Sequence, residues 1–259
     1  MPATAIITGA SSGIGFELAK VFAQEGYDLI ITARRKERLK NLQTEIENDY
    51  NVKVHVIPLD ITKEDNACRL LDYTEKNNLN ITALVNNAGV GDYGSFHTSE
   101  WIRQSQIIEL NIKALTHLTH LFLPALMKNE RSYILNVAST AAFQPGPLMS
   151  VYYASKHYVL AFSEAIADEL QGYRVTVTAL CPGPTESEFQ KVANMQTSKL
   201  IDRFPLATSH KVAEYGYKAM KKGKRVAVYG FYNKLLLKTI GLFPRSFVTA
   251  AVRKIKERK

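Results

Sequence analysis

Short runs of β-branched and apolar residues alternate along the chain with longer stretches of helical period. The strand-like runs are Ala3–Thr8, Asp28–Thr32, Val52–Pro58, Ala83–Asn86, Ser132–Val137, Arg174–Leu180 and Arg225–Tyr229. The helical stretches are Gly13–Glu25, Lys36–Asn48, Glu64–Asn77, Glu100–Met127 and Met149–Gln171. Strands separated by helices are typical of right-handed βαβ units. The pattern therefore predicts a single-domain, Rossmann-like α/β fold, a doubly wound parallel sheet of about seven strands in a three-layer αβα sandwich.

The composition changes this picture little. The chain has 259 residues, of which 46% are hydrophobic, enough for one large core. Its two cysteines, Cys68 and Cys181, show no CxxC or metal-ligand spacing, so we predict neither a disulfide framework nor a metal site. No basic leader precedes the first strand, and no apolar run reaches the roughly 18–20 residues that span a bilayer. We expect a cytoplasmic protein.

A glycine-rich loop joins the first strand to the first helix. From Thr8 to Gly15 it reads Thr-Gly-Ala-Ser-Ser-Gly-Ile-Gly. Glycine permits positive φ and close backbone approach, and the following helix N-terminus offers unpaired N–H groups that suit a pyrophosphate. An ordinary βα turn is the alternative, but the position between strand and helix favours a dinucleotide site. Its residues would be Gly9, Ser11, Ser12, Gly13, Ile14 and Gly15.

This spacing, Gly-x-x-x-Gly-x-Gly, resembles the Thr-Gly-x-x-x-Gly-Ile-Gly fingerprint of the short-chain dehydrogenase/reductase family. The resemblance runs from about Ala3 to Gly230, and two further family motifs fall in register. Asn86-Asn87-Ala88-Gly89 follows the fourth strand, and Ser139, Tyr152 and Lys156 have the family's order and spacing. Residues 1–230 would then form the catalytic domain.

Tyr152 and Lys156 lie at i and i+4, so their side chains share one helix face. A free phenol has a pKa of about 10, and a nearby cation lowers it toward the range that general acid–base catalysis needs. By the resemblance, Tyr152 exchanges the proton, Lys156 also holds the nicotinamide ribose, and Ser139 hydrogen-bonds the carbonyl oxygen. Tyr153 is assigned to packing or substrate contact. A chance surface pair is the alternative, which the serine spacing argues against.

The second strand ends in Ala33-Arg34-Arg35. Dinucleotide folds that prefer NAD usually carry an acid at this place, whereas a 2′-phosphate requires arginine. Because Ala33 stands where the family's NAD-type aspartate would be, we predict NADP(H) over NAD(H), bound by Arg34 and Arg35 with help from Ser11. The alternative is that both arginines are solvated residues opening a helix.

Other cofactor contacts follow from the resemblance alone. Asp60, with Ile61, would meet the adenine, although a helix N-cap is nearly as good a reading of Asp60. Asn111, inside the long helix from Glu100, would be the fourth catalytic residue and bind a water that relays protons to the lysine. The remaining expected contacts are Asn87, Ala88 and Gly89 at the adenine ribose and Pro182, Gly183, Thr185 and Ser187 beside the nicotinamide.

Residues 184–205 are expected to form a substrate lid. Tyr93, Phe143, Leu148, Met149 and Phe189 fall near the expected pocket and suggest a substrate with an apolar body, although they could equally be core.

The C-terminal segment, residues 231–259, interleaves leucines with lysines. The net charge of +9 comes from this end of the chain, because residues 211–259 hold 14 Lys+Arg and 2 acids while the first 210 residues hold 19 and 22. We expect a basic amphipathic helical extension packed on the same domain. Binding to anionic lipid or to an acidic partner is the alternative, and nucleic acid is not expected because no reading motif accompanies the charge.

These features together predict an NADP(H)-dependent oxidoreductase that transfers a hydride between nicotinamide and a ketone or 3-oxoacyl compound. The extension puts the family's tetramer contact in doubt, so a homodimer is predicted. Two other classes stay open, a catalytically silent NADP(H)-binding sensor and a membrane-surface protein that uses its basic tail.

Overall fold

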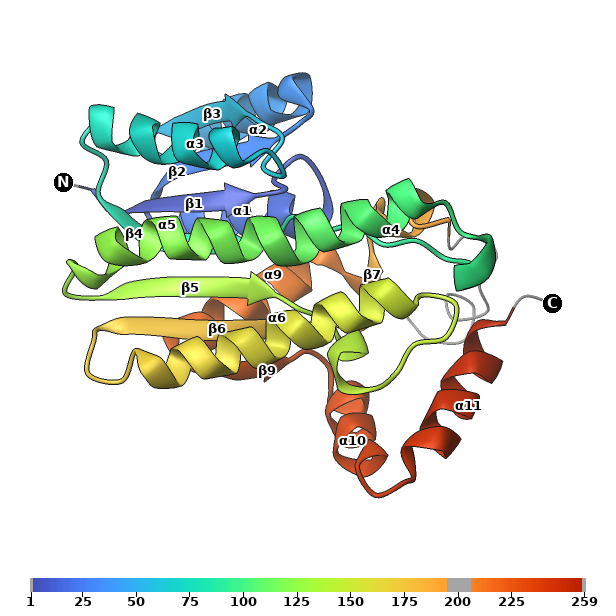
Figure 1. Cartoon of the computed structure of the whole chain (residues 1–259). Helices are drawn as coiled ribbons and strands as arrows, with labels where there is room; N and C mark the ends of the chain where they lie inside the picture. The colour runs from blue at the N-terminus through green and yellow to red at the C-terminus, as the bar shows by residue number, and fades with distance from the viewer. Residues whose placement is uncertain (1, 195–205, 258–259) are drawn as a thin grey trace.

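Seven parallel strands form one sheet in the computed structural model, which describes residues 2–194 and 206–257 (Figure 1). The strand order is β3-β2-β1-β4-β5-β6-β9, so the chain winds outward in both directions from β1. This confirms the predicted doubly wound α/β fold. The strands are β1 Thr4–Thr8, β2 Asp28–Ala33, β3 Val54–Pro58, β4 Ile81–Asn86, β5 Ser132–Val137, β6 Val175–Cys181 and β9 Val226–Val228.

Helices cover both faces of this sheet (Figure 1). One face carries α1 Gly13–Gln24, α2 Lys36–Asp49 and α9 Ser209–Lys221, and the other α3 Glu64–Lys76, α4 Trp101–Ile108, α5 Leu115–Met127 and α6 Ser150–Glu169. The sequence pattern did not predict α9. This helix carries Gly216 in its interior, and a Cβ there would lie 2.6 Å from a Leu180 methyl group, so glycine permits close packing on β6.

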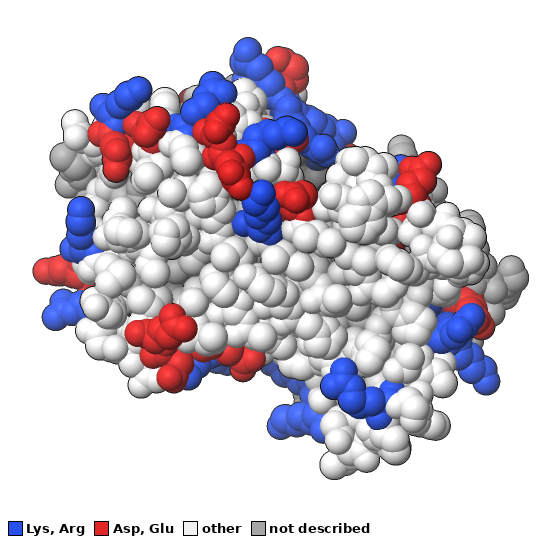
Figure 2. Space-filling model, in the orientation of Figure 1, with Lys and Arg blue, Asp and Glu red and all other residues white. Residues whose placement is uncertain are grey.

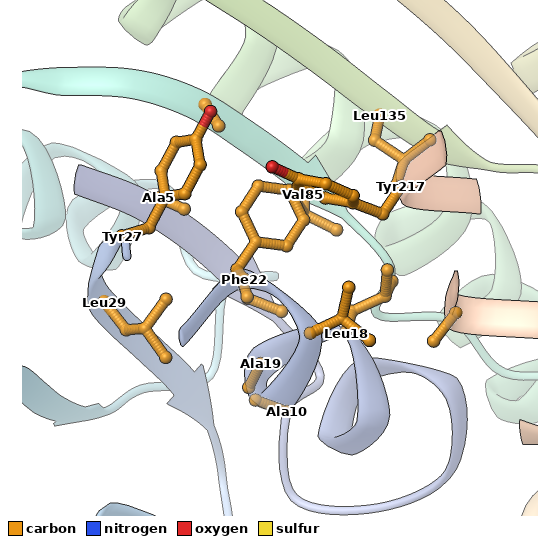
Figure 3. Close-up of a cluster of buried hydrophobic side chains, with 14 of the residues drawn as sticks. Ala5, Ala10, Leu18, Ala19, Phe22, Tyr27, Leu29, Val85, Leu135 and Tyr217 are labelled. Carbon is orange, nitrogen blue, oxygen red and sulfur yellow. The ribbon is translucent and has the colours of Figure 1, made fainter. Parts of the chain in front are cut away.

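The core on the α1 side is aromatic where three elements meet (Figure 3). The Phe22 ring packs edge-on against Tyr27 and Tyr217, with centroids 5.1 and 4.9 Å away. Edge-to-face contacts at such distances are favourable because ring edges are positive and faces negative. They fix α1 and α9 against the sheet and so position the glycine-rich loop at the start of α1.

The helix predicted from residue 100 to 127 is present from Trp101 to Met127, but its hydrogen-bond pattern changes part of the way along. A π-helical turn, Glu109–Ala114, separates α4 from α5. Such turns widen the helix by one residue and are frequent at functional sites.

Short elements close the carboxyl edge of the sheet. These are 3₁₀ turns at Phe96–Thr98 and Thr140–Phe143, the helix α7 Phe189–Val192, and the two-stranded sheet of β7 Thr185–Glu186 and β8 Ala207–Thr208. Of the predicted lid, residues 195–205 lie outside the described residues.

The C-terminal segment forms two helices, α10 Phe231–Ile240 and α11 Arg245–Lys256, which project from the body as a V (Figure 1). We call residues 231–256 the tail hairpin. It is held to the body through α11, where Val248 in the first turn and Lys256 at the end are buried and the Tyr93 hydroxyl donates to the Lys256 carbonyl at 2.5 Å. By contrast, α10 has no buried residue. Across the described residues, every helix falls short of the length and apolarity that crossing a membrane needs.

Candidate active site

A cleft of about 780 Å³ opens at the carboxyl ends of the central strands. Loops that follow parallel strands meet at this edge, where open α/β sheets bind ligands. Nearly all the predicted site residues line the cleft, namely Gly9, Ser11, Ser12, Gly13, Ile14, Arg34, Arg35, Asp60, Ile61, Asn87, Ala88, Gly89, Ser139, Tyr152, Lys156, Pro182, Gly183, Thr185 and Ser187. The two others, Gly15 and Asn111, are buried beneath its wall.

The glycine-rich loop has the backbone that its sequence predicts. Gly9 and Gly13 have φ of +69° and +60°, the left-handed region that favours glycine. A Cβ on Gly15 would overlap the Asn87 side chain, so this glycine lets α1 approach the loop after β4 and does not itself face the cleft. The first-turn N–H groups of α1 lack helical partners, an arrangement that suits an anionic group such as a phosphate.

The segment after β4 ties two strands together. The Asn87 amide donates to the Thr8 carbonyl at 2.9 Å, and the backbone N–H groups of Asn87 and Ala88 both donate to the Thr8 hydroxyl at 3.0 Å. These bonds hold the end of β4 against the end of β1. They fix the distance between the phosphate loop and the rest of the cleft.

Arg35 reaches back from the start of α2 to the phosphate loop. Its guanidinium donates to the Ser11 hydroxyl at 2.9 and 3.1 Å and to the Ser12 hydroxyl at 2.8 Å. It also donates to Glu188 at 2.6 Å, as does Arg38. Arg34 is exposed on the cleft wall, and no described acid lies within ion-pair distance of it. Glu188 could not be identified from the sequence, because nothing local distinguishes this acid from its neighbours.

Asp60 lies at the rim of the cleft and does not cap α3. Its Oδ1 accepts from the Thr62 N–H at 3.1 Å and from the Thr62 hydroxyl at 2.8 Å, which closes a turn. The N-cap position of α3 belongs to Lys63. The N-cap reading of Asp60 is therefore wrong.

Tyr152, in the first turn of α6, hydrogen-bonds to the Ser139 side chain that follows β5. Burial raises the pKa of Tyr152 to about 12, and the bond to Ser139 opposes this only in part. The expectation that Lys156 lowers this pKa is thus wrong, because burial raises the pKa and only the bond to Ser139 opposes the rise. The phenol is neutral at physiological pH and can donate a proton.

Lys156 lies one turn further along α6, with its ammonium 5.8 Å from the Tyr152 ring centre. The side chain is 6% exposed, and its Nζ donates to the Val137 carbonyl at 2.7 Å. Burial lowers the pKa of Lys156 to about 8, so the ammonium is still mostly protonated at pH 7. The Val137 carbonyl at the end of β5 thus orients the lysine, a role that the sequence does not reveal.

Asn111 sits inside the π-helical turn and is 1% exposed. Its amide donates to the Val90 carbonyl at 2.9 Å and to the Ser155 hydroxyl at 3.0 Å, and its Oδ1 accepts from the Val90 N–H at 2.9 Å. These bonds join the helix to the loop after β4 and to α6. A Cβ on Gly89 would lie 3.3 Å from Asn111 Oδ1 and 3.5 Å from Lys156 Nζ, so Asn111 adjoins the lysine.

The segment after β6 forms the remaining wall. The Pro182 carbonyl accepts from the Thr140 N–H at 2.9 Å, which holds this turn against the Ser139 loop. The hydroxyls of Thr185 and Ser187 bond backbone carbonyls two residues earlier, at 2.9 and 3.4 Å. Burial raises the pKa of the Cys181 thiol to about 12, so it is unsuited to act as a nucleophile.

The substrate side of the cleft is apolar. Of the five apolar residues singled out in the sequence, Met149 and Phe189 line the cleft, while Tyr93 and Leu148 pack behind them and Phe143 packs beside α6. Gly91 is a further lining residue, because a Cβ there would lie 2.8 Å from the Phe189 ring and 3.2 Å from that of Tyr152.

Tyr153 is buried but still lines the cleft, with its ring centre 6.0 Å from that of Tyr152. The Lys256 ammonium of α11 lies 3.5 Å from the Tyr153 ring centre. This position fits packing and substrate contact, the two roles predicted for Tyr153, and Tyr152 alone of the two tyrosines bonds to Ser139.

Known proteins resemble this chain in both sequence and structure. A model of the short chain dehydrogenase family matches residues 3–198. The chain is 36% identical over 197 residues to sulfoacetaldehyde reductase 2 of Chromohalobacter salexigens. The aligned region covers 72% of this chain and 74% of that protein.

Two solved structures have the same fold. A short-chain dehydrogenase from Sphingobium yanoikuyae in complex with NADPH has a TM-score of 0.82 and 28% identity, covering 93% of this chain and 95% of that one. The 3-ketoacyl-(acyl-carrier-protein) reductase from Brucella melitensis complexed with NADH has a TM-score of 0.76 and 27% identity, covering 88% and 94%.

Proposed function

Because this chain belongs to the short-chain dehydrogenase family, we propose that it is an NADP(H)-dependent oxidoreductase that interconverts a ketone and a secondary alcohol. One observation carries the proposal: Tyr152 and Lys156 share a face of α6 at the cleft, and Ser139 hydrogen-bonds the phenol. This combination provides a proton donor, a nearby cation and a second hydroxyl at one place.

The cleft residues fit a dinucleotide. The loop of residues 9–15 supplies unpaired N–H groups at the start of α1, and side chains on Gly9 or Gly15 would collide with Asn87 or Ala88. The pyrophosphate would lie on these N–H groups, and Asp60 would face the adenine. A bound nicotinamide would supply or accept the hydride.

The preference for NADP(H) rests on the end of β2. Arg34 and Arg35 both line the cleft, and no acid stands at Ala33. A 2′-phosphate would receive charge-assisted hydrogen bonds from this pair. The two solved relatives carry NADPH in one case and NADH in the other, so these arginines are the reason for choosing NADP(H) here.

In the reductive direction, Tyr152 donates its proton to the carbonyl oxygen as negative charge develops there. Because the pKa of Tyr152 is raised to about 12, the phenol carries its proton throughout the neutral range. Ser139 donates a hydrogen bond to the same oxygen, an interaction that strengthens as charge builds up. In the oxidative direction, Tyr152 must first lose its own proton, and its phenolate then accepts the alcohol proton.

Lys156 acts on this tyrosine through its charge. Its ammonium would stabilise the phenolate that remains after proton transfer, and its other N–H groups would hold the nicotinamide ribose. Asn111 keeps the loop at Val90 in place beside the lysine, so we assign it a positioning role in the transfer of protons to Lys156.

Met149 and Phe189 favour a substrate with an apolar body, which includes ketones and 3-oxoacyl compounds. The relatives named above include an aldehyde reductase and a 3-ketoacyl reductase. The test is to follow NADPH oxidation by the purified protein across panels of ketones, aldehydes, quinones and 3-oxoacyl thioesters. Turnover of a ketone or 3-oxoacyl compound is expected, and no turnover in any panel would instead support the silent-sensor alternative.

A further inference from the structure

The tail hairpin is the most apolar exposed part of the described chain. Seven of its large apolar side chains are exposed, out of thirteen among the described residues. On α10 they occupy positions 231, 232, 235 and 236, which share one face of a helix. The exposed fractions are 74% for Phe231, 83% for Tyr232, 53% for Leu235, 51% for Leu236, 81% for Leu242, 50% for Phe243 and 60% for Phe247.

All the charged residues of this segment are basic. Residues 231–256 contain six Lys+Arg and no acid, whereas the first 210 residues carry 19 Lys+Arg and 22 acids. Lys234 and Lys238 are exposed on α10, and Arg245 is exposed at the start of α11. Figure 2 shows basic side chains among uncharged ones on this projection.

The hairpin is fixed to the body near both ends, and between them Lys234 lies 5.2 Å from the Tyr215 ring centre of α9 and Val248 is buried. At its start, the Asn233 amide donates to the Tyr229 carbonyl at 2.8 Å and packs on Gly183, where a Cβ would lie 2.6 Å away. At its end, Lys256 is held by Tyr93 and by the Pro147 carbonyl. Leu242 and Phe243 lie at the turn between these two attachment points. Their side chains are exposed to solvent.

We propose that the tail hairpin docks on the surface of an anionic lipid bilayer. The turn and the exposed face of α10 would enter the boundary between headgroups and acyl chains, and Lys234, Lys238 and Arg245 would meet the anionic headgroups. Aromatic side chains next to lysines are typical of such interfacial segments.

Charge favours the bilayer over a second copy of the chain. Two hairpins that paired through this face would bring two acid-free basic segments together, whereas an anionic bilayer offers opposite charge and an apolar layer at once. The helices are too short to cross it, since ten residues of α10 extend about 15 Å against a core of about 30 Å.

The apolar part of the proposal is tested by sedimentation of the full chain with phosphatidylcholine vesicles, with or without phosphatidylglycerol. Phe243→Ser is compared with Tyr173→Ser, an equally exposed aromatic (50% against 53%) that lies on the loop between α6 and β6. Phe243→Ser should weaken binding to the anionic vesicles about tenfold. Tyr173→Ser should bind like the unmodified chain, and phosphatidylcholine alone should bind weakly.

The charge part uses two triple variants of equal net charge. Lys234→Glu/Lys238→Glu/Arg245→Glu removes the basic face of the hairpin, and Lys40→Glu/Lys76→Glu/Lys128→Glu changes exposed lysines on the body. At about fivefold per basic residue, the hairpin variant should bind anionic vesicles at least about a hundredfold more weakly. The body variant should lose far less, and thermal melts confirm that each variant is folded.

Three outcomes would overturn the proposal. The full chain stays in the supernatant with anionic vesicles, or both triple variants lose binding equally, or light scattering shows a dimer that Phe243→Ser converts to a monomer without any vesicle binding. In the last case, a second copy covers the face. None of these measurements depends on turnover, so they are independent of the proposed oxidoreductase activity.

Discussion

Glu188 accepts a 2.6 Å hydrogen bond from Arg35 and so joins the segment after β6 to the segment after β2, on either side of the phosphate loop. Arg35 and Arg38 hold the pKa of Glu188 at about 2, so the carboxylate is ionised throughout the physiological range. The ion pair with Glu188 occupies the Arg35 guanidinium, which the 2′-phosphate of a bound NADP(H) would use. We infer that cofactor phosphate and Glu188 compete for Arg35.

Glu188→Gln should therefore tighten the binding of NADPH. An exposed ion pair contributes up to about 1 kcal/mol, so the Kd for NADPH should fall by up to about fivefold. The Kd for NADH should change much less, because NADH carries no 2′-phosphate. Fluorescence titration with both cofactors measures this, and weaker NADPH binding would show that Glu188 helps to close the site.

Arg34→Leu and Arg35→Leu should each weaken NADPH binding by roughly tenfold or more, because a hydrogen bond to a charged group contributes about 1.5–3 kcal/mol. NADH binding should be nearly unchanged in both variants. Lys36→Leu is the control, since it removes an exposed positive charge at the start of α2 from a side chain that does not line the cleft. Equal losses for NADPH and NADH would contradict the assigned phosphate contact.

The pH profile of ketone reduction should report Lys156. Its pKa is lowered to about 8, so the ammonium is present below that pH and is lost as pH rises through it. The value of kcat/KM for the substrate should therefore fall above pH 8, while the neutral phenol of Tyr152, with a pKa of about 12, persists. Lys156→Arg, if it retains measurable turnover, should move this limb to higher pH. A limb that stays near pH 8 in that variant would assign it to another group.

Lys256 should make the stability of the fold depend on pH. Burial lowers its pKa to about 7, below the unfolded value of about 10.4, so from about pH 7 to 10 the unfolded chain binds more protons and stability rises with pH. Lys256→Met should thus raise Tm most at about pH 6, with a gain that shrinks by about pH 9. The exposed Lys254→Met serves as the control. A Tm difference that is equal at both pH values would contradict this account.

The sequence was sufficient to predict the sheet and to bring nearly all the predicted site residues to the cleft, although other lining residues, such as Ile102 and Arg103 of α4, were not predicted. The reason is geometric, because parallel strands bring the residues that follow them to one edge. Gly9, Asn87, Ser139 and Gly183 are far apart in the chain but each follows a strand. Once the strands are identified, it follows that the residues after them lie close together.

Long-range partners could not be predicted in the same way. The partners of Asn111 in the π-helical turn are 21 and 44 residues away, and those of Glu188 are 150 and 153 residues away. The pKa of Tyr152 depends on its degree of burial, which its spacing from Lys156 does not contain. In the tail hairpin, the apolar pattern predicted helices but not that α10 would leave its apolar face exposed.

The most direct test of the central claim is the turnover of Tyr152→Phe, measured together with its affinity for NADPH. Removing the hydroxyl takes away the proton donor but leaves the ring, Lys156 and the phosphate loop. General acid–base catalysis by one group contributes about 10²–10⁴-fold to the rate. The kcat should therefore fall at least about a hundredfold, while the Kd for NADPH stays within about twofold. A variant that still reduces the substrate at the original rate would contradict the assignment of Tyr152 as the acid.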